Sequence, residues 1–185
     1  MPTVVIRPDG DITVGNFSNT PVTAVLSDSD DTTFTNNTTT NQVFEVSLDD
    51  VSLSGATFNS FILTTRAKRS GKGNAEWNAQ LQTSGGSALC DDDFTSTSTS
   101  YADFNSSSTS FSGGFSESDV NGLKVRIETI NSRQCFFAEV FVTIDYTAAA
   151  SGPSNLISYS GIRKENITSI NGITIANVTS INGVS

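Results

Sequence analysis

The feature that most constrains how this chain can fold is an alternation of apolar and polar residues with a period of two. Residues 42–48 show it clearly, because Phe44, Val46 and Leu48 alternate with the polar residues that lie between them. Successive side chains of a β-strand point to opposite faces of a sheet, so the pattern predicts a half-buried strand.

The same alternation predicts further strands along most of the chain. Its apolar positions include Phe61 and Leu63; Ala75, Trp77, Ala79 and Leu81; and Leu123, Val125 and Ile127. The longest predicted strand covers residues 135–146, with a predicted buried face of Phe136, Ala138, Val140, Val142, Ile144 and Tyr146. These apolar faces must pack against one another, because each sheet needs a second layer to bury its apolar side.

Turn-forming sequences separate the predicted strands, among them SGGS at residues 84–87 and NG at residues 121–122. Such residues adopt the backbone conformations that sharp reversals require, and no segment of convincing length has a helical period. We therefore predict an all-β fold, an antiparallel jelly-roll-like β-sandwich over residues 1–148, followed by an extended C-terminal arm.

The C-terminal arm, residues 149–185, begins with a hinge of small residues and contains a repeat. The segment NITSINGI at residue 166 returns as NVTSINGV at residue 177, eleven residues later. An eleven-residue repeat can indicate a right-handed helical supercoil, but β-branched residues and Asn-Gly pairs favour short strands with turns.

Two copies of such a repeat cannot bury their own apolar side chains, because repeat folds need about three stacked units. The residues that need burial are Ile167, Ile170, Ile173, Val178, Ile181 and Val184. We predict that they dock against the sandwich of the same chain or, by strand addition, against another protein chain.

The charge of the chain excludes several partners. The formal net charge is −9, so phosphate backbones and anionic lipid surfaces should repel it. No apolar run approaches the ~20 residues that span a bilayer, and the first residues lack the features of a secretory signal. We expect no nucleic-acid partner, no membrane partner and assembly in a cytoplasm.

The chain contains no histidine, which excludes Ser-His-Asp triads and the usual zinc sites. A pair of carboxylates could still hydrolyse glycosides, but we expect a non-enzymatic protein without a cofactor. The acidic clusters at residues 28–31 and 91–93 could bind calcium, although solvated loop charge is the preferred interpretation.

Three other features allow two interpretations each. The basic run of Arg66, Lys68, Arg69 and Lys72 is either one polar strand face or a contact for an acidic neighbour. Trp77 could stack on a sugar, but its alternation with alanines favours the core. Cys90 and Cys135 could form a disulfide, although two reduced thiols are the preferred interpretation.

Several segments together resemble small β-sandwich structural proteins of tailed bacteriophages. They are TVVIRPDGDITVGNF, LSDSDDTTF, LTTRAKRSGKGNAEWNAQLQ, VNGLKVRIET, AEVFVTIDYTA and the Ile-Asn-Gly tail. The resemblance covers most of the chain and rests on patterns, so it carries over no functional residue. It implies a non-enzymatic virion component, since similar sandwiches serve as head decoration, head fibres and tail parts.

We therefore expect a capsid-associated decoration or cement protein that is assembled in the host cytoplasm and resides in the virion. Its expected partners are the major capsid protein or tail and portal components, together with further copies of itself. The alternative is a tail or fibre protein whose sandwich binds a host glycan, with Tyr101, Phe104 and Phe111 as stacking platforms.

Overall fold

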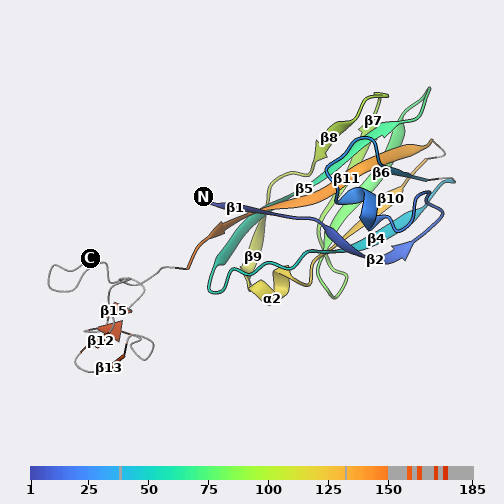
Figure 1. Ribbon diagram of the computed structural model, residues 1–185. Helices are drawn as coiled ribbons and strands as arrows, with labels where there is room; N and C mark the ends of the chain where they lie inside the picture. Colours follow the sequence, from blue (N-terminus) through green and yellow to red (C-terminus); the bar gives the residue numbers. More distant parts are fainter. Residues whose placement is uncertain are drawn as a thin grey trace. The chain divides into compact units, whose positions relative to one another are not determined.

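The computed structural model describes residues 1–37, 39–131 and 133–149, together with four two-residue strands further along the chain. The chain divides into two compact units, Met1–Thr147 and Ala148–Ser185. Figure 1 shows the chain in sequence colours, from blue at the N-terminus to red at the C-terminus.

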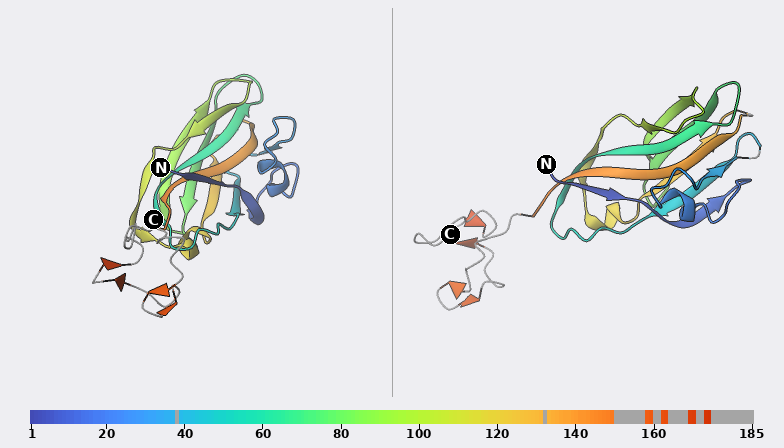
Figure 2. Two further views of the ribbon diagram at one scale, coloured as in Figure 1. Left: turned by 60° about the vertical axis from the view of Figure 1, so that its left-hand side comes forward. Right: turned by 45° about the horizontal axis from the view of Figure 1, so that its top comes forward.

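The first unit is a sandwich of two antiparallel sheets. One sheet has the order β1-β11-β5-β8, with β3 also pairing with β11 and β9 with β5. Its strands are β1 (Thr3–Ile6), β3 (Thr35–Asn36), β5 (Thr57–Arg69), β8 (Ala102–Asn105), β9 (Thr109–Phe115) and β11 (Cys135–Thr147). In both views of Figure 2, the long strands β5 and β11 lie side by side.

The second sheet has the order β2-β4-β10-β6-β7. Its strands are β2 (Pro8–Val14), β4 (Val43–Leu48), β6 (Ala75–Gln82), β7 (Ala88–Ser96) and β10 (Lys124–Thr129). The two sheets confirm the predicted all-β, jelly-roll-like β-sandwich.

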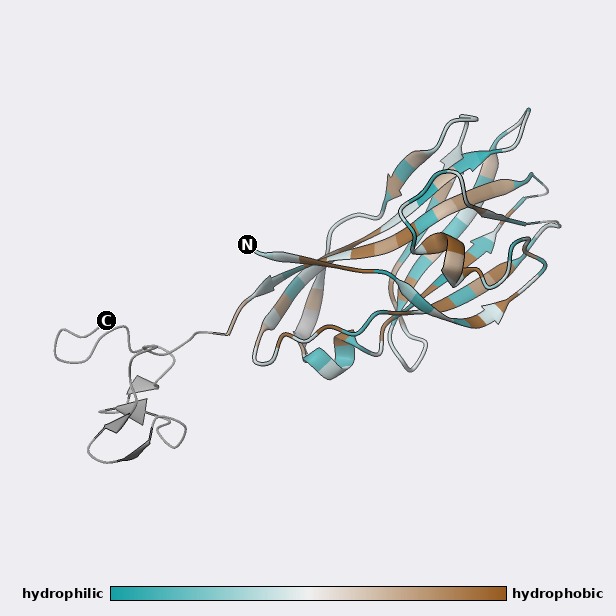
Figure 3. Cartoon of the chain, in the orientation of Figure 1, coloured by the Kyte–Doolittle hydropathy of each residue, from teal (hydrophilic) through white to brown (hydrophobic). Residues whose placement is uncertain are grey.

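The core lies between the sheets and follows the predicted alternation. Along β4, β6 and β10 every second residue is buried, and Figure 3 shows the same banding of hydrophobic and hydrophilic residues. The largest fully buried side chains include Trp77, Phe44 and Phe137. Phe137 lies edge-on to both of the others, with ring centroids 5.6 and 5.7 Å away. Aromatic side chains from both sheets therefore hold the layers together.

The predicted buried face of β11 is wrong at Phe136. The pairing of β11 with β5 shifts register between Phe137 and Glu139, which inserts Ala138 as an extra residue. Such a bulge interrupts the strict alternation, so Phe137 is buried in the core while Phe136 is only half-buried. Val142, beyond the bulge, is buried as predicted.

One turn of helix, α1 (Thr23–Leu26), follows β2 and contacts both β2 and β11. Its Leu26 side chain belongs to the core. The carboxylate of Asp11 accepts hydrogen bonds from the backbone N–H groups of Val22 (3.0 Å) and Thr23 (2.9 Å). These bonds satisfy donors that a helix start leaves without backbone partners.

A second single turn of helix, α2 (Glu117–Val120), precedes β10. Ser116 and Asp119 form a capping box, in which each side chain bonds the backbone N–H group of the other residue. None of the helices in the described part of the chain is long and apolar enough to cross a bilayer.

The described part of the second unit consists of two small antiparallel pairs. Strand β12 (Ser158–Tyr159) pairs with β13 (Ile162–Arg163), and β14 (Ser169–Ile170) pairs with β15 (Ile173–Thr174). In both pairs the strands are two residues long and two residues apart in the sequence. The β14–β15 pair lies at the first copy of the repeat, where the sequence predicts short strands.

Candidate functional site

The carboxylates of both acidic clusters accept hydrogen bonds from other groups of the same chain. No three His, Cys, Asp or Glu side chains of the described residues group into a possible metal site. Asp91 and Asp93 alternate along β7, and both accept a hydrogen bond from the side-chain amide of Asn78, at 2.6 and 2.9 Å. Three consecutive aspartates on an edge strand disfavour pairing with another sheet.

The other acidic cluster, residues 28–31, forms a loop with internal hydrogen bonds. The carboxylate of Asp28 accepts from the backbone N–H of Asp30 (3.0 Å), and Asp30 accepts from that of Thr32 (2.8 Å). The hydroxyl of Thr32 also donates to Asp30 and lowers the pKa of that carboxyl. These bonds fix the loop conformation.

Arg66 lies where the basic run meets this loop. Its guanidinium binds both carboxylate oxygens of Asp31, at 2.6 and 2.7 Å, and donates to Asp103 at 2.9 Å. The hydrogen bond from Arg66 lowers the pKa of Asp31. The acidic partner of Arg66 therefore lies within the same chain.

The other members of the basic run have separate surroundings. The ammonium of Lys68 lies 4.1 Å from the centre of the Tyr101 ring, a cation–π contact, and Arg69 donates to the carbonyl of Gly73 at 2.9 Å. Lys72 is exposed in the turn that follows. The run is therefore not a continuous positive patch.

The Tyr101 ring that Lys68 contacts is partly buried, and this burial raises the pKa of its hydroxyl to about 12.

Trp77 and Phe111 belong to the interior, and the half-buried Phe104 packs against it. Trp77 is 0% exposed, and its indole N–H donates to the hydroxyl of Thr65 at 3.3 Å. Phe104 lies edge-on to Trp77, with ring centroids 4.8 Å apart, while Phe111 is buried against Phe61 at 5.1 Å. The buried Phe111 therefore offers no open ring face for a sugar. The core interpretation of Trp77 is confirmed.

Both cysteines are free thiols. Cys135 is buried at the start of β11, and burial raises the pKa of its thiol well above the usual value. Cys90 lies half-buried on β7 of the other sheet, where burial also raises the thiol pKa. The structure therefore favours the reduced-thiol interpretation over a disulfide, and neither thiol has the lowered pKa of a reactive cysteine.

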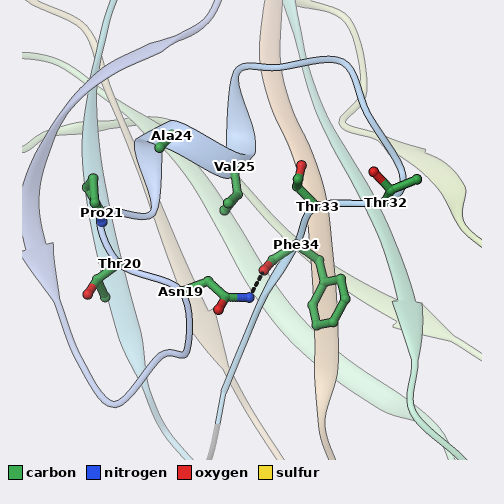
Figure 4. Close-up of a pocket in the computed structure, with 8 residues that line it drawn as sticks. All are labelled: Asn19, Thr20, Pro21, Ala24, Val25, Thr32, Thr33 and Phe34. Carbon is green, nitrogen blue, oxygen red and sulfur yellow. Dashed lines mark hydrogen bonds between the residues drawn. The ribbon is translucent and has the colours of Figure 1, made fainter.

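An open pocket of about 440 Å³ lies between residues 19–25, which include part of α1, and residues 32–34, which follow the acidic loop (Figure 4). It is lined by Asn19, Thr20, Pro21, Ala24, Val25, Thr32, Thr33 and Phe34. The side-chain amide of Asn19 donates to the carbonyl of Phe34 at 2.6 Å and so joins the two walls.

The chemistry of this pocket suits a neutral polar ligand. Threonine hydroxyls and the Asn19 amide supply hydrogen-bonding groups, and the half-buried Phe34 ring supplies an apolar surface. The ring is itself supported edge-on by Phe136 at 4.9 Å. Sequence reasoning missed this pocket, although Phe34 stands out as the only aromatic residue in the polar tract of residues 27–42.

The predicted docking residues lie in the second unit. Ile170 and Ile173 are directly opposite each other in the β14–β15 pair. Ile167, Val178, Ile181 and Val184 lie outside the described residues. Docking of these residues against a partner stays a prediction.

No family model matches the chain, and no curated protein matches it either. Among solved structures, CBM35 from Paenibacillus barcinonensis is 16% identical over 80% of this chain and 99% of its own, with a TM-score of 0.44. The CBM22-1 xylan-binding domain from Paenibacillus barcinonensis Xyn10C is 10% identical over 75% and 92%, with a TM-score of 0.36.

A structure of infectious bursal disease virus, Gt strain, is 8% identical over 82% of this chain and 34% of its own, with a TM-score of 0.33. Likenesses this weak say nothing about what the present chain binds.

Proposed function

We propose that this chain is a non-enzymatic structural component of a bacteriophage virion, in the role of a capsid-associated decoration or cement protein. The observation that carries the proposal is the division into a sandwich with its own core and a separate unit that contains the Ile-Asn-Gly repeat. The sandwich supplies the rigid body, and the C-terminal unit, Ala148–Ser185, supplies the attachment.

The small strand pairs of the C-terminal unit require a partner to bury their apolar side chains. An isolated two-stranded hairpin is marginally stable in water, and these strands are only two residues long. Each isoleucine or valine of the repeat gains about 1.5–3 kcal/mol when it is fully buried. A lattice of identical docking sites supplies that burial many times over, so weak individual contacts add up to firm attachment.

The distribution of charge supports a place on the outside of a particle. Residues 1–147 contain 8 basic and 18 acidic residues, a net charge of −10, whereas residues 148–185 contain 2 basic and 1 acidic residue, a net charge of +1. The acidic sandwich would be repelled by packaged DNA, and the C-terminal unit would not be repelled by an acidic surface. The proposed partners are the major capsid protein or tail and portal components.

Removal of residues 151–185 tests the proposal. We expect the truncated chain to keep the thermal melting curve of the full chain, because the sandwich and its core lie within residues 1–147. We also expect it to lose most of its co-sedimentation with phage particles, because the repeat is gone.

A second, full-length variant tests the repeat alone, with threonine in place of its six apolar residues, Ile167, Ile170, Ile173, Val178, Ile181 and Val184. Threonine keeps the β-branched shape but has less apolar surface, so this variant should also fail to bind particles. A truncated chain that melts far below the full chain and still binds particles would show that the repeat belongs to the sandwich.

A glycan-binding role in a tail or fibre protein is the second candidate, and the pocket beside Phe34 favours it. If this pocket binds a sugar, Phe34→Ala should weaken glycan binding about tenfold or more, because the ring is its one aromatic surface. The measurement is a glycan array followed by calorimetry, with Phe141→Ala, another half-buried ring outside the pocket, as the control. An array without any bound glycan would exclude this role.

A further inference from the structure

Strand β1 has one free edge. Among the described strands it pairs with β11 alone. Just before β1, the carbonyl of Pro2 accepts a hydrogen bond from the N–H of Tyr146 at 3.1 Å. In an antiparallel ladder such bonds recur at every second residue, so Val4 and Ile6 face β11. The N–H and C=O groups of Val5 therefore face the free edge.

A groove of about 470 Å³ lies along this edge. It is lined by Val4, Val5, Ile6, Asp49, Asp50, Val51, Ser52 and Leu53. The side chain of Asn121 fixes the wall opposite β1, because it accepts from the N–H of Val51 at 2.8 Å and donates to its C=O at 3.1 Å. A groove that is ordered in advance loses less entropy when it binds a partner.

The edges of the other sheet are protected against pairing, whereas β1 is not. Strand β7 carries aspartates at residues 91–93, and β2 begins with Pro8 and contains Asp9 and Asp11. Charges and proline on an edge strand block its pairing with foreign strands. Strand β1 has the sequence TVVI, and its Val5 side chain is 47% exposed. This edge is therefore open to strand addition along Thr3–Ile6, up to Arg7, whose carbonyl accepts a hydrogen bond from the N–H of Asp49 at 2.8 Å.

The charges beside the groove indicate what kind of segment would fit. Asp49 and Asp50 are exposed, and none of the ion pairs between described residues includes either carboxylate. The C-terminal unit carries an adjacent pair of cations, Arg163 and Lys164, within a segment rich in β-branched residues. Both the charge and the strand preference of that unit complement the groove.

We propose that the free edge of β1 accepts a strand from the C-terminal unit of a second copy of this chain, with Arg163 and Lys164 beside Asp49 and Asp50. This inference rests on the proposed function, which assigns attachment to the C-terminal unit. It adds that one surface to which this unit attaches is the β1 edge of a second copy. A second copy is favoured because β11 ends beside the start of β1, with Asp145 opposite Thr3. A direct return of the same chain would run parallel to β1, whereas a second copy can pair in the more stable antiparallel direction.

Sedimentation velocity of the full chain tests this proposal. We expect a concentration-dependent oligomer, and Val5→Pro should raise its dissociation constant at least tenfold. Proline at this position removes the N–H that faces the incoming strand and leaves the bonds to β11 in place. Val5→Thr, which keeps that N–H and the β-branched shape, should associate like the natural chain.

A charge exchange provides a second test that does not depend on the backbone. Replacing Asp49 and Asp50 by lysine should weaken association, and so should replacing Arg163 and Lys164 by glutamate. A chain with all four changes should regain association, because the opposite charges face each other again. A monomeric natural chain, or association that both Val5→Pro and the charge changes leave unaltered, would overturn the proposal.

Cysteine cross-linking decides which copy supplies the strand. Both natural cysteines are replaced by alanine, and chains with Ser52→Cys are mixed with chains with Asn166→Cys, the pair that the proposed register brings together. Cross-linked pairs that need both chains support the proposal, whereas a cross-link formed within one chain that carries both changes refutes it.

Particle binding is measured in a separate experiment. A monomeric chain that binds particles contradicts only this inference, and an oligomer that binds no particle contradicts the proposed function.

Discussion

Val142→Asp should unfold the sandwich at room temperature. Val142 is 0% exposed on the central strand β11, where it pairs with Ile6 of β1 and Leu63 of β5. An aspartate there would be a buried charge among apolar side chains, which costs several kcal/mol. Most domains are stable by only about 5–15 kcal/mol, so little or no folded population should remain. Circular dichroism and the fraction of soluble protein measure the effect.

Thr143→Asp is the matched control for this substitution. Thr143 is the next residue of β11 and lies on the half-buried outer face, between Val5 and Ile62. An aspartate there remains in contact with water and should cost about 1 kcal/mol, mainly through its low strand preference. If Val142→Asp melts like the natural chain, Val142 does not face the core.

Trp77→Ala should lower the free energy of unfolding by about 3–5 kcal/mol, the usual range for a large buried aromatic side chain. The substitution leaves a cavity between the sheets beside Phe137 and Phe104. It also leaves the buried hydroxyl of Thr65 without the indole donor. Urea denaturation followed by circular dichroism gives the change, since Trp77 is the only tryptophan and its loss removes the fluorescence probe.

Trp77→Phe separates packing from hydrogen bonding. Phenylalanine keeps most of the apolar contacts but cannot donate to Thr65, so the expected loss is smaller than for alanine. Equal losses for the two variants would mean that the hydrogen bond, and not the packing of the ring, dominates the stability at this position.

The sequence predicted the fold class and most of the buried face of each long strand. Every second residue of β4, β6 and β10 is buried, because the pleat of a strand turns alternate side chains to opposite sides. Trp77 was assigned to the core for the same reason. These features depend on the local geometry of one strand, so a single sequence contains enough information to predict them.

The bulge in β11 could not be predicted from the sequence. Nothing in the letters around Ala138 indicates a bulge, because the extra residue appears only when β11 is aligned with β5. The consequence is large for side-chain placement, since Phe136 and Phe137 exchange their expected faces.

The candidate sites were predicted only in part. The repeat in the C-terminal unit was visible in the sequence, and so was the need of its isoleucines for burial. The pocket beside Phe34 was not visible, because its walls come from α1 and from the loop after it, which meet only in the folded chain.

The sequence by itself determined that this protein is an antiparallel sandwich with an apolar repeat after it, because strand alternation and repetition are properties of neighbouring residues. Only the tertiary structure decided where charges are neutralised and which edge stays open. Arg66 meets Asp31 and Asp103 from distant parts of the chain, and β1 borders a groove whose other wall follows β4. Ion pairs and grooves depend on which segments fold side by side, and that is set by the packing of the whole sandwich.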